Sequence, residues 1–188
     1  MVSRVVPSKR LLASVVVAAA LAPAPALATL APSKTAPTKA HKTSTLERAL
    51  LHSHELWATI DVCNPADQPS TVGIRGSMPG DDHPHDRMYM SFRLQYLSAA
   101  KSWVNLASGA SSGFVAVGTG ASPRQGGTSF ELKPVAGKPA VTLRGVVDFQ
   151  WRRDKTILVS GAEPTAAGHL SLAGADPANY SAATCVIG

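Results

Sequence analysis

The feature that most constrains this chain is a strict alternation of apolar and polar residues in two long stretches, residues 87–97 (RMYMSFRLQYL) and 141–152 (VTLRGVVDFQWR). This period of two is typical of a β-strand with one face in a core and one in solvent. The two apolar sets are Met88, Met90, Phe92, Leu94 and Tyr96, and Val141, Leu143, Val147, Phe149 and Trp151. Both strands must bury one face, which favours two stacked sheets.

Shorter stretches with the same period begin at Leu56 and are separated by Pro, Gly, Asn and Asp residues that form turns. We count about seven or eight strands between residues 56 and 188. The predicted fold class is therefore all-β, an antiparallel sandwich of two sheets in one domain, residues 56–188.

The first 28 residues have the pattern of a secretory signal peptide. Basic residues precede an apolar run at 11–21, LLASVVVAAAL, and Ala26-Leu27-Ala28 has the small-x-small pattern of a cleavage site. The apolar run is shorter than the about 20 residues of a membrane span. We therefore predict cleavage after Ala28, a secreted, extracellular protein and no membrane span in the mature chain. An uncleaved N-terminal anchor is the alternative.

Two short segments are predicted between the signal and the sandwich. Residues 29–43, TLAPSKTAPTKAHKT, have no apolar period and predict a disordered spacer. Residues 44–55 predict one short helix, because Ser44 and Glu47 have capping-box spacing.

The net charge argues against a nucleic-acid-binding protein. The whole chain has a net charge of +6. From Leu56 onward there are eleven Lys and Arg and ten Asp and Glu, so the net charge of the domain is near +1. Most of the net positive charge lies in the predicted signal and spacer. A nucleic-acid-binding domain carries a concentrated basic charge on its folded surface.

Two cysteines stand near the two ends of the predicted domain, Cys63 and Cys185. An exported protein permits a disulfide, so one bridge between the first and last strands is predicted. A pair of buried free thiols is the alternative. Ala58, Ile60 and Val62 are predicted to point inward, and Cys63 is out of phase with them unless a β-bulge intervenes.

In strand number, length and alternation, residues 56–188 resemble the immunoglobulin-like and fibronectin type III-like sandwiches. Immunoglobulin domains place a Trp soon after the first cysteine and a Tyr two residues before the second. Here Trp103 lies 40 residues after Cys63, and Tyr180 lies five before Cys185. The resemblance therefore concerns architecture alone, and such folds carry many functions.

The segment DDHPHD, residues 81–86, predicts a metal site. In an extended chain His83 and His85 point to the same side, and imidazole suits zinc or copper. A neighbouring carboxylate, Asp81 or Asp82, could supply an oxygen ligand, and the predicted set is Asp82, His83 and His85. The alternative is a polar turn between two strands, because Pro, Gly and Asp favour turns.

The outward residues of the two long strands form a second candidate site. Arginine and tyrosine favour interfaces, and neighbouring strands would bring these side chains together. The residues of the predicted binding face are Arg87, Tyr89, Arg93, Arg144 and Arg152. A solvated face without a partner is the alternative.

One pattern matches a hydrolase motif in its residue types and their order along the chain. Residues 109–113 fit G-x-S-x-G around Ser111, and Asp148 and His169 follow in α/β-hydrolase order. That motif needs a helix after the serine, and the sequence FVAVGTG favours a strand there.

The predicted function is therefore that of a non-catalytic extracellular binding or structural module, which binds a protein, a glycan or an envelope component. A zinc- or copper-binding exported protein is the alternative.

Overall fold

The computed structural model describes residues 44–107 and 109–188. The predicted signal peptide and spacer lie outside this part of the chain. Nine strands and one helix form in the described residues. They are α1 (Thr45–Leu51), β1 (Trp57–Cys63), β2 (Thr71–Met78), β3 (Arg87–Leu97), β4 (Trp103–Asn105), β5 (Ser111–Thr119), β6 (Arg124–Glu131), β7 (Val141–Arg153), β8 (Thr156–Pro164) and β9 (Cys185–Ile187).

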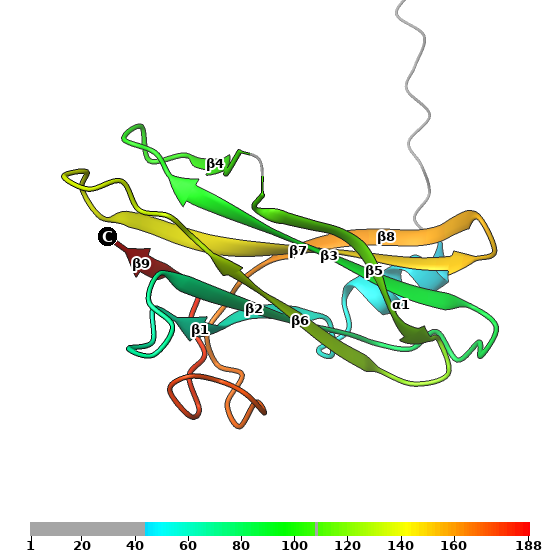
Figure 1. The fold of residues 1–188 in the computed structure, drawn as a ribbon. Helices are drawn as coiled ribbons and strands as arrows, with labels where there is room; N and C mark the ends of the chain where they lie inside the picture. Colours follow the sequence, from blue (N-terminus) through cyan, green and yellow to red (C-terminus); the bar gives the residue numbers. More distant parts are fainter. Residues whose placement is uncertain (1–43, 108) are drawn as a thin grey trace, which may run out of the picture. The chain divides into compact units, whose positions relative to one another are not determined.

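The strands form two antiparallel sheets that lie as two layers (Figure 1). The smaller sheet has the order β1-β2-β6. In the larger sheet β3 and β7 are central neighbours, β4 and β5 pair with one side of β3, and β8 and β9 pair with the far side of β7. The all-β prediction is confirmed, and the count exceeds the expected seven or eight because the three-residue strand β4 was not predicted.

The core lies between the layers and contains the alternating residues of the sequence. Every predicted inward residue of β3 and β7 is buried except Tyr96, which is half-buried, and Val141, which is exposed at the start of β7. The largest fully buried side chains are Trp151, Phe92, Phe149, Ile60, Ile74, Met78, Met88, Met90, Leu94, Leu143, Val72 and Val147. Burial of these apolar surfaces is the main force that holds the two sheets together.

The helix α1 begins as predicted and ends earlier. Ser44 accepts from the Glu47 backbone N–H at 3.0 Å, and the Glu47 carboxylate accepts from the Ser44 N–H, which completes the capping box. The helix ends at Leu51 rather than at residue 55, because the polar residues that follow turn the chain into β1. Leu50 is buried in the core, and α1 lies beside β8 (Figure 1).

A β-bulge in β1 explains the phase of Cys63. The register with β2 shifts between Ile60 and Val62, so Cys63 pairs with the buried Val72. Val62 was expected to point inward, and this is wrong, because the bulge turns it to the other face beside Gly73. The predicted disulfide is present: Cys63 and Cys185 are bonded, with Cα atoms 5.6 Å apart. It joins β1 of the smaller sheet to β9 of the larger.

None of the helices in the described residues has the length and apolar character needed to cross a membrane.

The ring of His169 stacks on Trp57, with centroids 4.1 Å apart, and burial lowers the pKa of this histidine. A lowered histidine pKa means that the unfolded chain takes up the proton first. Stability should therefore be full above about pH 6.5 and fall on acidification below it. His169→Phe should keep the stacking and reduce this dependence, measured by urea unfolding between pH 8 and 5. Titration of His169 by NMR at or above its ordinary pKa would contradict the prediction.

Candidate functional site

The predicted binding face lies on the solvent side of the larger sheet, which we call the outer face. The strands β3 and β7 are neighbours, as the prediction required, and all five predicted residues are on them. In the register of the two strands, Arg87 lies opposite Arg152, and Tyr89 lies opposite Gln150. Further along, Gln95 is the partner of Arg144. Residues on alternate positions of paired strands share one face, so these side chains form one surface.

Arg152 is held over two aromatic rings at one end of the outer face. Its guanidinium lies 4.1 Å from the Tyr89 ring centroid and 5.0 Å from that of Phe114. Its Nε also donates to the Gln150 side chain at 2.7 Å. Cation–π contact and a hydrogen bond together restrict the rotamers of this arginine.

Arg144 is held in a similar way at the other end. It lies 4.4 Å from the Trp103 ring centroid, and its Nε donates to Gln95 at 2.8 Å. Burial and the nearby Arg93 lower the pKa of Arg144, which still stays far above neutrality. Arg93 itself forms an ion pair with Asp148.

The outer face is therefore basic and partly aromatic. Asp148 pairs with Arg93, whereas Arg87, Arg144 and Arg152 form no ion pair within residues 44–107 and 109–188. Sequence reasoning missed Trp103 and Phe114, which come from the neighbouring strands β4 and β5. Phe114 is 42% exposed, with the Arg152 guanidinium over its ring.

The second predicted site, the loop of residues 79–86, is fixed to the sheets by backbone hydrogen bonds. The Asp82 N–H donates to the Gly120 carbonyl, and the Gly120 N–H donates to the Asp86 carbonyl, both at 3.0 Å. Gly120 permits this approach, because a Cβ there would lie 1.8 Å from Asp81 Oδ1. The indole of Trp151 donates to the Pro79 carbonyl at 3.0 Å.

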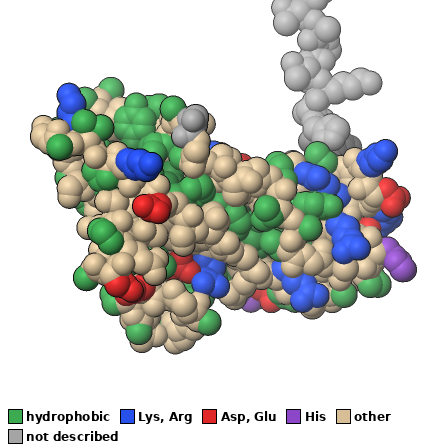
Figure 2. All heavy atoms as spheres, viewed as in Figure 1, with side chains coloured by type: hydrophobic (Ala, Val, Ile, Leu, Met, Phe, Trp, Pro, Cys, Tyr) green, Lys and Arg blue, Asp and Glu red, His purple; other side chains and the backbone are tan. Residues whose placement is uncertain are grey.

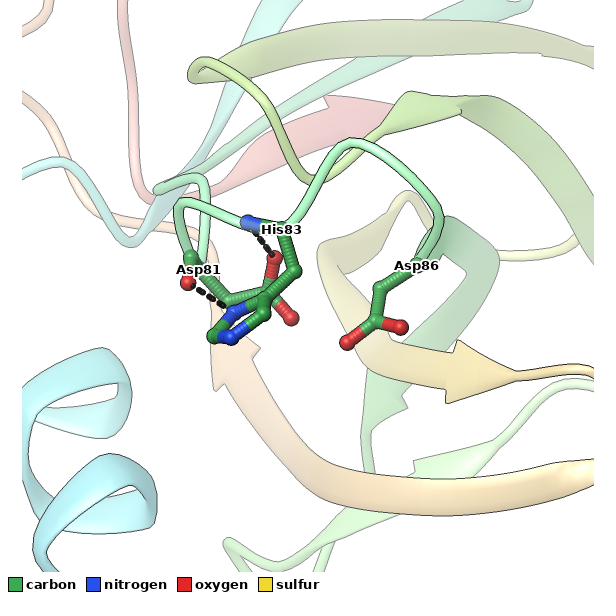
Figure 3. Close-up of side chains that lie close together, drawn as sticks. All are labelled: Asp81, His83 and Asp86. Carbon is green, nitrogen blue, oxygen red and sulfur yellow. Dashed lines mark hydrogen bonds between the residues drawn. The ribbon is translucent and has the colours of Figure 1, made fainter.

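The loop brings together Asp81, His83 and Asp86, and one ligand atom of each lies within 4.8 Å of the other two. Figure 3 shows the Asp81 carboxylate between the His83 ring, which is turned back toward the Asp81 backbone, and the Asp86 carboxylate. Of the predicted ligands, His83 is therefore in this cluster. Asp82 and His85 are exposed and lie outside it.

The two carboxylates of the cluster are electrostatically different. Burial raises the pKa of Asp81, and the adjacent Asp86 raises it further. Arg153 lowers the pKa of Asp86, because it donates to both carboxylate oxygens, at 2.7 and 2.9 Å. Asp81 Oδ1 accepts from the His83 N–H at 3.1 Å, whereas Asp81 Oδ2 is buried and has no hydrogen-bond partner in the described part of the chain.

A cavity of about 620 Å³ opens at the end of the domain beside β9. Figure 2 shows apolar side chains gathered there, with a few basic ones among them. Its lining includes Leu132, Val135, Val141, Leu143 and Ile187 and the exposed Lys133 and Lys138. Ligand pockets also contain convergent polar groups that orient the ligand. The two lysines are on the exposed loop after β6, so this cavity is a weaker candidate than the outer face.

The residues of the hydrolase pattern are engaged separately. Asp148 pairs with Arg93 on the outer face, His169 stacks on Trp57, and Ser111 Oγ accepts from the Gly113 N–H. Within the residues that the structure describes, no hydrogen bond joins Ser111, Asp148 and His169.

Comparison with known proteins adds no family. No protein-family model and no curated protein matches the chain. Two solved structures are weakly similar. The first is the Pseudomonas fluorescens alkylpurine DNA glycosylase AlkC bound to DNA with an abasic site analog, with 12% identity over 59% of this chain and 28% of that chain and a TM-score of 0.33. The second is Bacteroides uniformis beta-glucuronidase 2 covalently bound to cyclophellitol-6-carboxylate aziridine, with 19% identity over 60% of this chain and 13% of that chain and a TM-score of 0.31. The chain thus spans less than a third of either protein's length.

Proposed function

We propose that this protein is an exported, non-catalytic binding module that recognises an acidic partner through the outer face. The architecture we propose is an immunoglobulin-like or fibronectin type III-like sandwich. The observation that carries the proposal is the set of arginines held over aromatic rings on exposed strands. Arginine and aromatic residues dominate the energetics of protein interfaces.

Export is supported by the sequence pattern of residues 1–28 and by the Cys63–Cys185 disulfide. Disulfides persist in oxidising compartments and are rare in the reducing cytosol. The partner is therefore proposed to be an extracellular protein, a glycan or an envelope component.

An acidic partner follows from the charge on the outer face. Arg87, Arg144 and Arg152 have no carboxylate partner among the described residues. A guanidinium binds carboxylate or sulfate groups through two parallel hydrogen bonds. The exposed rings of the same face supply apolar surface, and glycans and proteins both offer groups that pack on it.

The side chains that would bind are also partly ordered in advance. Tyr89 and Phe114 restrict Arg152, and Gln95 and Trp103 restrict Arg144. Ordering a long side chain on binding costs about 0.5–1.5 kcal/mol, and a side chain already held in place avoids part of that cost.

The test is binding of the full chain to two immobilised polyanions, heparin as an acidic glycan and polyglutamate as an acidic peptide. We expect one of them to bind, with an affinity that falls with salt. Arg144→Glu combined with Arg152→Glu should weaken binding at least about 100-fold, since each arginine is expected to contribute about 1–3 kcal/mol.

The control is a second double charge reversal away from the outer face, Arg48→Glu with Lys133→Glu. It changes the net charge of the chain by the same amount and should reduce binding much less. Equal losses for the two double variants would mean that net charge alone attracts the polyanion. That result, or no binding to either polyanion, would reject the outer face as the recognition surface for an acidic partner.

A further inference from the structure

Asp81 is an unusual buried residue, because half of its carboxyl group has no partner. The side chain is 5% exposed. Its Oδ1 accepts a hydrogen bond from the His83 backbone, but no group within residues 44–107 and 109–188 donates to its Oδ2. An unpartnered buried polar atom costs about 1–3 kcal/mol, so a group that satisfies it is expected.

The unpartnered oxygen belongs to the cluster of Asp81, His83 and Asp86. Figure 3 shows the Asp81 and Asp86 carboxylates facing one another, with the His83 ring beside them. Ligand atoms of the three residues lie within 4.8 Å of one another. In a tetrahedral site, two ligand atoms about 2.0–2.2 Å from one zinc ion are about 3.3–3.6 Å apart, so the side chains would have to move closer together to complete the set.

We propose that Asp81, His83 and Asp86 bind one divalent transition-metal ion of the zinc type, with Asp81 Oδ2 as a ligand. This site is distinct from the outer face, so it does not depend on the proposed binding function. It also differs from the ligand set expected from the sequence, since Asp82 and His85 take no part.

The hydrogen bond of His83 fixes the nitrogen that is free for a metal. Its Nδ1 lies 2.7 Å from the Asp81 carbonyl oxygen. A carbonyl only accepts, so Nδ1 carries the proton and Nε2 carries the lone pair. A metal-binding histidine commonly donates its second N–H to a carbonyl or a carboxylate in this way.

Arg153 fixes the Asp86 carboxylate without using all of its acceptor capacity. It donates to both oxygens, and each oxygen keeps a further lone pair. The cluster therefore has two carboxylates, of which Arg153 balances one. An imidazole together with carboxylates suits a divalent transition ion better than Mg²⁺, which prefers oxygen ligands alone.

A cleft of about 410 Å³ adjoins the site at Asp81. It lies between α1 and the loop, and Asp81 and Asp82 are among its lining residues. A cation with three protein ligands needs a water or another ligand in its fourth position. Such a water has access from the solvent beside His83, which is exposed.

The test is titration of the metal-free full chain with ZnCl₂ by calorimetry, with MgCl₂ as comparison. We expect one Zn²⁺ per chain and much weaker binding of Mg²⁺. Asp81→Asn keeps the shape of the side chain, and His83→Ala changes an exposed residue that should not affect folding. Each should weaken Zn²⁺ binding by more than about 100-fold, because loss of a direct ligand exceeds the 10–100-fold typical of an outer-shell partner.

The matched control is Asp82→Asn combined with His85→Gln, which changes the same residue types in the same loop. It should bind Zn²⁺ as the wild type does. Loss of binding in this control together with retention in His83→Ala would assign the ion to the exposed residues and overturn the proposal. Absence of stoichiometric Zn²⁺ binding to the wild type would also overturn it, because the Asp81–Asp86 pair would then hold a proton instead.

Discussion

Replacing Cys63 and Cys185 with alanine should cost about 3–5 kcal/mol of the free energy of unfolding. The disulfide joins residues 122 positions apart and links the two sheets. For a loop of this length, the chain-entropy estimate is about 5 kcal/mol, and removal of native disulfides commonly costs about 2–5 kcal/mol. β9 has only three residues and pairs with three residues of β7, so it depends strongly on this bond.

Guanidinium unfolding of oxidised wild type, reduced wild type and the double alanine variant would measure the loss. The reduced wild type is the control, since it keeps both sulfur atoms in the core and lacks only the bond. We expect it to be destabilised nearly as much as the variant. A loss below about 1 kcal/mol in both would mean that the unfolded chain gains little freedom when the bond is removed.

The sheets and most of the core could be predicted because their signal is local. A strand with one wet face needs a period of two, and residues 87–97 and 141–152 keep that period over their whole length. The pairing of β3 with β7 was a hypothesis, because strand order depends on contacts between distant residues. The short strand β4 carries too few residues for a period to be recognised.

The bulge in β1 could be suspected but not located. Cys63 was out of phase with Ile60, and one extra residue anywhere between them would correct this. The structure places the shift at Asp61, which pairs with Arg75 at 2.7 Å. The ion pair depends on β2 lying beside β1, which the local pattern of β1 does not contain.

For the cluster of Asp81, His83 and Asp86, the sequence identified the loop but not the set of residues. The spacing of His83 and His85 suggested a common side because an extended chain was assumed. The loop is a turn instead, and Asp82 has a left-handed backbone with φ of 62°. This turn exposes Asp82 and His85 and places Asp81 and Asp86 inside. Which carboxylates turn inward was decided by Gly120 and Arg153, which are distant in sequence.

Replacing Trp151 with alanine should also destabilise the protein by about 3–5 kcal/mol, the usual cost of truncating a large buried aromatic side chain. Trp151 is fully buried and is the largest buried side chain in the described residues. Its indole N–H donates to the Pro79 carbonyl at the start of the loop that holds Asp81, His83 and Asp86. Trp151→Phe should cost about 1–3 kcal/mol, because it leaves that buried carbonyl without a donor.

The control for these variants is Trp103→Ala on the outer face, where the ring is half-buried beneath Arg144. This change should alter stability by much less than Trp151→Ala, because the site is open to water. A similar loss for the two alanine variants in urea unfolding would contradict the assignment of the core.

The variant Trp151→Phe separates stability from the geometry of the loop. If the Pro79 hydrogen bond positions the loop, this variant should bind Zn²⁺ more weakly even at temperatures where it is fully folded. Unchanged Zn²⁺ affinity in the folded variant would mean that the two Gly120 hydrogen bonds suffice to hold the loop.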